Sequence, residues 1–180
     1  LHVLVSHPTP PVFDGPEDRN GRRNADEIRF WADYVQGAEW IYDDAGTTGG
    51  LAPGAHFVIA GDLNADPVDG DSLPGAVQQL LDLPLIDTSV TPSSDGGSAA
   101  AAAQGGANAG HAGDPARDTA DFGDDPGRNG PGNLRVDYVL PSSTLRIEGA
   151  GIVWPVDGPL ARAADRASDH RLVWIDVTLP

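Results

Sequence analysis

Apolar runs of two kinds predict the strands of this chain. Short continuous runs such as Leu1–Ser6, which ends at His7-Pro8, indicate buried strands. Towards the end of the chain, apolar residues alternate with polar ones, so that Val173, Ile175, Val177 and Leu179 share one face. The predicted strands cover residues 1–6, 56–60, 134–140 and 171–179, with a further candidate at 152–154.

Helical spacing is clearest after a Pro/Gly/Asp-rich loop. Asn24 stands three residues before Glu27, which is the spacing of an N-cap residue and its partner carboxylate. Apolar residues follow at helical intervals, namely Ile28, Trp31, Ala32 and Val35. We therefore predict a helix over 25–36 that packs one face on a sheet, and a short helix over 75–83.

Residues 88–133 are rich in Ala, Gly, Ser and Asp, and Phe122 is their only aromatic residue. Such a stretch buries too little apolar surface to offset its ordering entropy, so we predict a low-complexity loop or insertion. The rest of the chain alternates strands with helices. This pattern predicts a single α/β (α+β) domain over 1–180.

Composition narrows the possible functions. The 180 residues carry 11 Arg, no Lys and 27 acidic residues, a net charge of −16 that argues against non-specific binding of polyphosphates. With no Cys there are no disulfides or thiolate metal sites, and no apolar run is long enough to span a membrane. Because the chain has no Met and opens in a strand-like run, we expect a piece of a longer protein; an extracytoplasmic or secreted location is favoured.

Three polar clusters lie within or next to the predicted apolar strands, at 61–64, 135–138 and 168–170. A carboxylate inside a strand, such as Asp137, is costly to bury unless it has a partner, and a histidine would serve. The first cluster follows a strand and the last precedes one. If those two strands are antiparallel neighbours, both clusters lie at one edge of the sheet, where His7 could join them.

These clusters resemble the endonuclease/exonuclease/phosphatase family, the DNase I-like metal-dependent phosphoesterases. The matching motifs are His7, Asp62 with Asn64 in Gly-Asp-Leu-Asn, Asp137 in Arg-Val-Asp-Tyr-Val-Leu, and Asp169 with His170 in Ser-Asp-His. The resemblance implies a sheet-and-helix sandwich. It also implies hydrolysis of a phosphate ester, of a small molecule or a nucleic acid, with Mg²⁺ or Mn²⁺ as cofactor and Ca²⁺ as an alternative.

The resemblance also implies a role for each matching residue. His170 would be the general base, oriented by Asp137. Asp62 and Asn64 would position the attacking water and the phosphoryl oxygen and share in the metal site with Asp169. His7 would contact the phosphate and stabilise the transition state.

One family feature has no counterpart in the chain. The family supplies an Asn near its opening strand and then a metal-binding Glu, and none of the four glutamates here stands in that context; they are Glu17, Glu27, Glu39 and Glu148. We therefore expect the C-terminal part of a two-sheet domain, with the missing N-terminal half as its partner. The alternative function is a truncated, non-catalytic binding module.

Several other residues have open alternatives. Arg22, Arg23 and Arg135 could bind substrate anions, or be ordinary surface arginines. Histidine and aspartates of the 88–133 segment could form a lip over the site, or belong to a disordered linker; they are His111, Asp114, Asp118 and Asp121. Asp62-x-Asn64-x-Asp66 is no EF-hand, because Pro67 and Leu73 replace the required Gly and Glu. The negative charge favours a small phosphoester over a nucleic acid as substrate.

Overall fold

The computed structural model of the chain describes residues 1–123 and 130–180. Its main sheet has the strand order β1-β2-β5, formed by β1 (His2–Val5), β2 (Phe57–Asp62) and β5 (Asp137–Pro141). β1 runs parallel to β2, and β2 runs antiparallel to β5. Because two neighbouring parallel strands need a crossover, the long connection between β1 and β2 carries α1 (Arg19–Val35).

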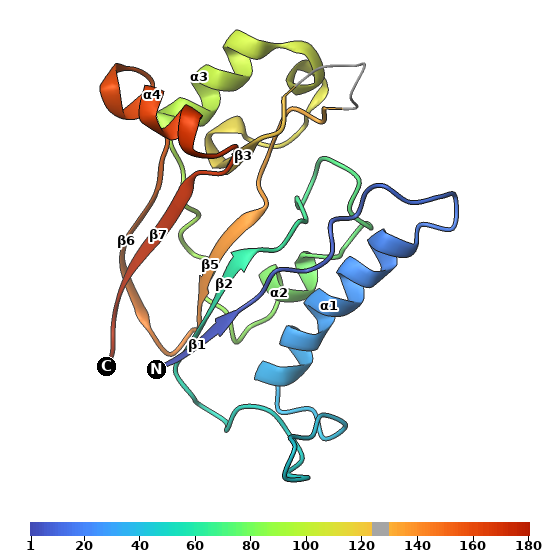
Figure 1. The fold of residues 1–180 in the computed structure, drawn as a ribbon. Coiled ribbons are helices and arrows are strands. Elements are labelled where there is room, and N and C mark those ends of the chain that lie inside the picture. Colours follow the sequence, from blue (N-terminus) through green and yellow to red (C-terminus); the bar gives the residue numbers. More distant parts are fainter. Residues whose placement is uncertain (124–129) are drawn as a thin grey trace.

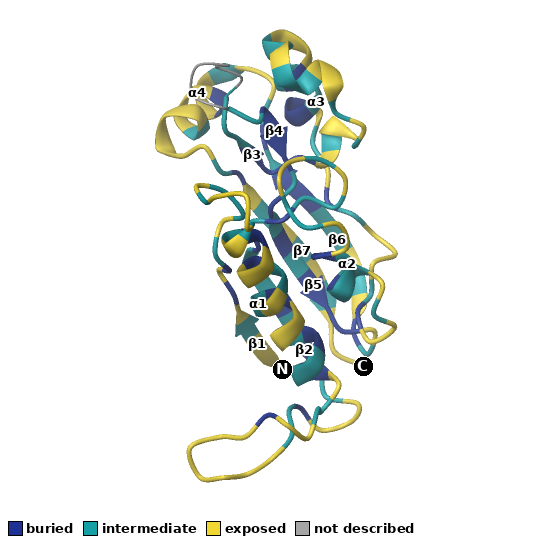
Figure 2. Ribbon diagram, turned by 90° about the vertical axis from the view of Figure 1, so that its right-hand side faces the viewer, coloured by how far each residue is buried: buried dark blue, intermediate teal, exposed yellow. Residues whose placement is uncertain are grey.

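Helix α1 covers one face of this sheet, together with α2 (Gln78–Leu81), as Figure 1 shows. The core between these layers contains Ile28 and Ala32 of α1, Ile59 of β2, Leu80 of α2 and Leu140 of β5. Figure 2 shows the buried residues concentrated on β2, β5 and the side of α1 that faces them. The sheet is thus anchored to α1, and the ends of β2 and β5 are held in place.

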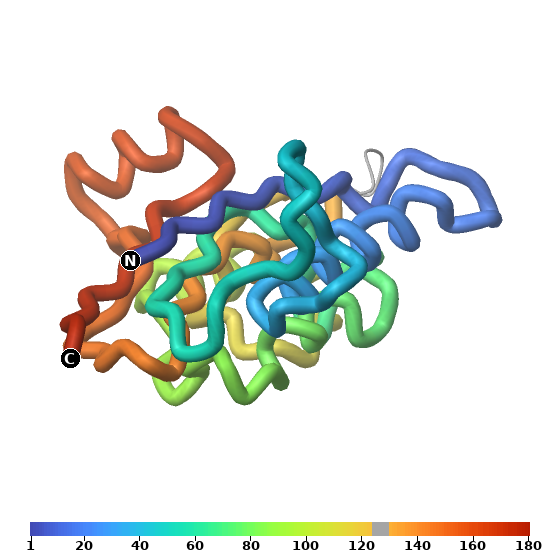
Figure 3. The backbone as a smooth tube through the Cα atoms, turned by 90° about the horizontal axis from the view of Figure 1, so that it is seen from below, coloured from blue at the N-terminus to red at the C-terminus, as the bar shows by residue number. Residues whose placement is uncertain are grey.

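The remaining elements lie beyond β5. An antiparallel pair is formed by β6 (Arg146–Val153) and β7 (Leu172–Thr178), with α4 (Gly158–Ala167) between them. A second pair is formed by β3 (Ala120–Asp121) and β4 (Asn133–Leu134). Both termini lie at one end of the molecule in Figures 1 and 3.

Two features of the predicted elements are wrong. Helix α1 begins at Arg19 after Asp18, so Asn24 is not its cap, and Arg22 and Arg23 lie inside the helix. The buried face of α1 begins at Gly21 and Asn24. Because neither residue has a large apolar side chain, the hydrophobic pattern of the sequence does not indicate this first part of the helix. The second wrong feature concerns β1, which was predicted to be a buried strand. The side chains of Val3 and Val5 are exposed.

The 88–133 segment has more regular structure than its composition predicts; its residues 124–129 lie outside the described part. It contains α3 (Asp95–Gln104), two 3₁₀ turns at Gly106–Gly110 and Pro115–Arg117, and strands β3 and β4. Ser94 caps α3 by accepting a hydrogen bond from the Gly97 N–H. Alanine favours helix without burying much surface, so the alanine run supports α3 despite its small apolar content.

The alternation predicted for the last strand is confirmed for Val173, Ile175 and Val177, which are less exposed than their neighbours, but Leu179 lies beyond β7 and is exposed. The strands predicted at 56–60 and 134–140 are also present, although β4 and β5 divide the latter. The predicted helix over 75–83 contains the shorter α2. No helix in the described part is both long and apolar enough to cross a membrane.

Candidate active site

Three polar side chains meet where β2 ends and β5 begins. Asp62 is the last residue of β2, Asp137 is the first residue of β5, and the two are register partners in the sheet. His170 precedes β7, and its backbone forms a bridge with Ala120 of β3. β5, and not β7, is the neighbour of β2, so the condition that β2 pairs with the last strand is not met. The predicted meeting of the polar clusters is nevertheless observed.

His170 and Asp137 form a side-chain pair. The Nδ1 atom of His170 lies 2.9 Å from Oδ2 of Asp137, and its Nε2 atom lies 3.9 Å from Oδ2 of Asp62. When Nδ1–H donates to Asp137, the lone pair of the neutral ring is on Nε2. The imidazole therefore presents its basic atom on the side of Asp62.

The environment strengthens His170 as a base. Burial alone would lower the pKa of His170, but the hydrogen bond and charge of Asp137, followed by the charges of Asp62 and Asp169, raise this pKa above 6.5. Burial raises the pKa of Asp137 above 3.8, against the lowering effect of its hydrogen bond to His170. The pair thus holds the imidazole in one orientation and increases its affinity for a proton.

His7 approaches Asp62 from the loop after β1. Its Nε2 atom lies 3.4 Å from Oδ2 of Asp62, while 72% of the His7 side chain is exposed. Asn64 has a positive φ of 50°, and its backbone N–H donates to Oδ1 of Asp62 at 2.8 Å. The Nδ2 atom of Asn64 donates to the carbonyl of Pro8 at 3.0 Å. The loop after β1 and the loop after β2 are therefore joined beside Asp62.

Sequence reasoning missed Thr119 as part of the site. Its buried hydroxyl accepts hydrogen bonds from the backbone N–H groups of Val136 and Asp137, at 3.0 and 2.9 Å. These bonds fix the backbone at the start of β5, from which the Asp137 side chain extends. A threonine inside a low-complexity segment gave no signal in the sequence. Phe122, noted there only as an isolated aromatic residue, meets the His170 ring edge-on with centroids 5.5 Å apart.

Arg171, likewise not predicted, supports the backbone around His170. Its Nη1 atom donates to the carbonyls of Ser168 and His170, at 2.6 and 3.3 Å. Its Nη2 atom donates to Asp165, and its guanidinium lies 4.5 Å over the ring of Trp154. A buried arginine with these contacts restrains the turn that presents His170.

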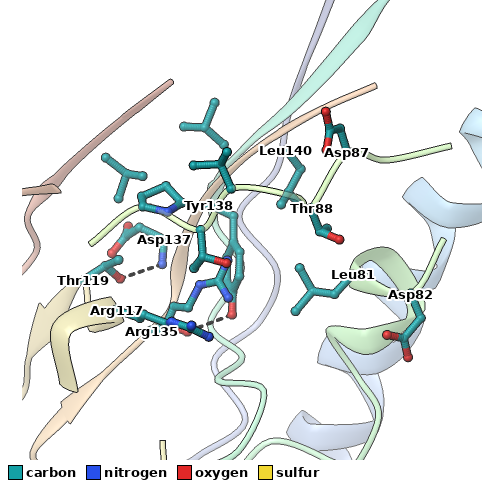
Figure 4. Close-up of a pocket in the computed structure, with 15 residues that line it drawn as sticks. Leu81, Asp82, Asp87, Thr88, Arg117, Thr119, Arg135, Asp137, Tyr138 and Leu140 are labelled. Carbon is teal, nitrogen blue, oxygen red and sulfur yellow. Dashed lines mark hydrogen bonds between the residues drawn. The ribbon is translucent and has the colours of Figure 1, made fainter. Parts of the chain in front are cut away.

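The other predicted site residues lie around this centre. Asp169 is exposed and its Oδ1 accepts from the Ser168 hydroxyl at 3.4 Å. Arg23 pairs with Glu27 within α1, and Arg22 lies one residue before it. Arg135 stacks on Tyr138, 4.7 Å from the ring centroid, and lines a cavity of about 250 Å³ with Thr119 and Asp137 (Figure 4).

The residues predicted as a lip make local contacts. Oδ1 of Asp121 accepts from Gln104 and from the Gly123 backbone, and Asp114 caps the turn at Pro115–Arg117. Asp118 is buried, and His111 lines a separate cavity with Asp69 and Asp118. Among the described residues, none of these four belongs to the group that could hold a metal.

Asp62, Asp137 and His170 could hold that metal ion. Each offers one ligand atom, and the three atoms lie within 4.8 Å of one another. Carboxylate oxygens suit hard divalent cations such as Mg²⁺, Mn²⁺ and Ca²⁺, and an imidazole nitrogen suits softer ions such as zinc. The donor set therefore fits a divalent cation. None of the four glutamates belongs to this group within the described residues.

The chain matches the model of the endonuclease/exonuclease/phosphatase family over residues 2–170. It belongs to this family. No significant match to a curated protein or to a solved structure accompanies this result. The family has the DNase I-like α/β fold, which agrees with the mixed sheets and helices of the chain. Its members are hydrolytic phosphoesterases, typically dependent on a divalent metal, and the matched range includes every residue of the group around Asp62.

Proposed function

We propose that the protein hydrolyses a phosphate ester by in-line attack of water, with a divalent cation as cofactor and without a covalent enzyme intermediate. The observation that carries the proposal is the meeting of Asp62, Asp137 and His170 from three separate segments. Membership of the phosphoesterase family supports the same reaction class. Mg²⁺ and Mn²⁺ are the ions we favour, with Ca²⁺ as an alternative, because Asp62 offers carboxylate oxygens as ligands. In this proposal His170 is not a ligand, because Asp137 occupies Nδ1 and the lone pair of Nε2 is needed for the proton.

Each side chain has a task in this proposal. Nε2 of His170 accepts a proton from the attacking water while the new oxygen–phosphorus bond forms and the bond to the leaving oxygen breaks. Asp137 keeps the ring in place and stabilises the imidazolium. Asp62 accepts a hydrogen bond from the water and orients it, because its Oδ2 faces Nε2 of His170.

His7 would contact the phosphoryl group. Its exposed ring lies at the rim beside Asp62, so it can reach a substrate without leaving the loop. A protonated His7 would stabilise negative charge that increases on the phosphoryl oxygens, and Asn64 would assist in orienting one of them. When bound, the cation supplies further stabilisation of that charge. Asp169 would contribute to the metal site through water, because its side chain lies outside the three-residue group.

A small phosphoester is the substrate class we favour over a nucleic acid. The net charge of −16 opposes the binding of a long polyanion. Arg135 would be a substrate-binding residue only for a group that enters the cavity behind Asp137. Arg22 and Arg23 lie in α1, where Arg23 is already paired with Glu27.

The test is hydrolysis of p-nitrophenyl phosphate and bis-p-nitrophenyl phosphate with Mg²⁺ or Mn²⁺, before and after chelation. We expect His170→Ala to lower kcat about 10²–10⁴-fold, the usual contribution of a general base. His56→Ala is the matched control, because His56 also bonds a side chain, Thr144 at 2.9 Å, but precedes β2 at its other end. Equal rates for wild type and His170→Ala, or no metal-dependent hydrolysis by the wild type, would overturn the proposal.

A further inference from the structure

Two loops beside Asp62 carry proposed catalytic residues. One follows β1 and carries His7, and the other follows β2 and carries Asn64, two residues after Asp62. Asp62 ends β2 and is placed by the sheet, but His7 lies in a loop outside it, so the strands alone do not fix the distance between His7 and Asp62. A contact from outside the sheet has to supply that restraint.

The side chain of Asn24 on α1 lies between these loops. Its Nδ2 atom donates to the carbonyl of Thr9 at 2.9 Å and to the carbonyl of Leu63 at 2.9 Å, with Asn64 O farther away at 3.4 Å. Asn24 is fully buried, with 0% of its surface exposed. One amide group thus binds the loop after β1, which carries His7, and the loop after β2, which follows Asp62.

The chemistry of this contact is directional. A primary amide has two N–H donors, and two backbone carbonyls at 2.9 Å use both of them. The Oδ1 atom of Asn24 is buried and has no hydrogen-bond partner among the described residues. An unpaired buried acceptor costs free energy. The hydrogen bonds that Asn24 donates therefore have to stabilise its buried position.

Further contacts of α1 reach the same loop from the same side of the helix. The Thr9 N–H donates to Glu27 at 2.6 Å, and the indole N–H of Trp31 donates to the Ser6 hydroxyl at 2.7 Å. Positions 24, 27 and 31 follow one another at intervals of three and four, so they share one face of α1. This face of α1 therefore holds the loop after β1 by hydrogen bonds, and Asn24 also binds the loop after β2.

We infer that Asn24 is a positioning residue that sets the separation of His7 and Asp62, whose side chains lie 3.4 Å apart. The inference rests on the proposed function, because it assigns Asn24 an effect on catalysis without contact with substrate. Loss of the amide donors would loosen both loops, which the hydrogen bond from Asn64 to Pro8 would still join, while the sheet and α1 remain folded. Small displacements of catalytic groups reduce the rate of the chemical step more than they reduce substrate binding.

The variants are Asn24→Asp, which replaces the donors by carboxylate oxygens opposite two carbonyls, and Asn24→Ala, which removes them without adding charge. The controls are Gln79→Glu and Gln79→Ala. Gln79 donates from its Nε2 to the carbonyls of Ala25 and Ala76 at 2.9 and 3.0 Å, so it makes the same kind of contact between α1 and α2, away from the two loops.

Two measurements are made on all variants: backbone hydrogen exchange, and kcat and KM with bis-p-nitrophenyl phosphate. We expect both Asn24 variants to speed exchange at least tenfold at the N–H groups of Thr9, Leu63 and Asn64, which are bonded in the wild type. Amides within α1 should stay protected. We expect kcat to fall roughly 10–100-fold with KM changed less than threefold. The Gln79 variants should keep both kcat and the protection of the two loops.

Wild-type exchange at Thr9, Leu63 and Asn64 in Asn24→Ala would overturn the inference, and so would loosened loops with unchanged kcat. If Asn24→Asp does not fold, Asn24→Ala alone decides. Absence of hydrolysis in the wild type would sink the proposed function, whereas the exchange measurement would still show whether Asn24 restrains the loops.

Discussion

His170 and Asp137 are 33 positions apart in the chain, yet the Nδ1 atom of the histidine lies 2.9 Å from Oδ2 of the aspartate. The contact depends on two supports: Thr119 fixes the backbone at Asp137, and Arg171 fixes the turn at His170. It also determines which ring nitrogen is available, since the occupied Nδ1 leaves Nε2 on the side of Asp62.

Asp137→Asn should lower kcat about 10–100-fold, because the ring loses the carboxylate that orients it. The pH profile should change as well. Asp137 raises the pKa of His170 against the lowering effect of burial. Without that charge the histidine stays neutral to lower pH, so the acidic limb of the kcat/KM profile should move to lower pH. Asp82→Asn, an exposed carboxylate, is the control. An acidic limb that stays in place would remove the pair from the mechanism.

Asp62→Asn should weaken Mn²⁺ binding at least about tenfold, because the carboxylate ligand at this position becomes a neutral amide. Isothermal titration with Mn²⁺ measures this directly and needs no substrate. Asp71→Asn is the matched control, since Asp71 is an exposed loop carboxylate. Equal Mn²⁺ affinity in the two variants would contradict a metal site at Asp62.

Gly61→Ala should destabilise the fold by about 2–4 kcal/mol. Gly61 has a φ of 147°, and an added Cβ would lie 1.9 Å from the backbone oxygen of Ser6. Gly46→Ala separates the two causes, because Gly46 also has a positive φ, 79°, but open space around the added atom. Chemical denaturation should show a loss of only about 1 kcal/mol for Gly46→Ala. A similar loss for both variants would mean that β1 can move away from β2 at no cost.

Asp118→Asn should stabilise the protein at neutral and higher pH. Burial, and after it the charges of three nearby aspartates, raise the pKa of Asp118 from 3.8 to about 7. Between these values the folded protein holds a proton that the unfolded chain has released, so the free energy of unfolding falls as pH rises through this window. The variant lacks this penalty and should exceed the wild type by about 1–4 kcal/mol at pH 8, on the order of the linkage expected for such a shift.

Denaturation of both proteins between about pH 3 and 8 checks this expectation, given the linkage between protonation and folding. The two curves should coincide at the acidic end and separate as pH increases. The exposed Asp82→Asn serves again as the control and should follow the wild type throughout. A constant difference at all pH values would show that Asp118 does not titrate in this range.

The sequence predicted the elements that have strong periodicity or dense apolar content. The stripe of Ile28, Ala32 and Val35 predicted the centre of α1, and the polar clusters at 61–64 and 168–170 contain Asp62 and His170, which lie close together in the structure. The start of α1 was not predictable from hydrophobicity. Its first buried positions are Gly21 and Asn24, and Asn24 is buried because it bonds two backbone carbonyls that only the fold brings near it.

Contacts that depend on long-range backbone pairing were also beyond sequence reasoning. Thr119 reaches Asp137 because the segment at Ala120 bridges His170 and pairs with β4. Nothing in the composition of 88–133 distinguishes this threonine from its neighbours. The roles of the site residues, and the contribution of Asp169, stay predictions that the variants above can test.

The exposure of Val3 and Val5 on β1 has a consequence for the protein in concentrated solution. Within the part of the chain that the structure describes, β1 is the outer strand of the β1-β2-β5 sheet, so it presents exposed valine side chains and a backbone edge that no strand of that part pairs with. Edges of this kind favour strand addition between molecules. Mutual repulsion from the charge of −16 counteracts such self-association, and added electrolyte weakens this protection. Ionic strength, as well as the fold, therefore determines how readily the protein self-associates.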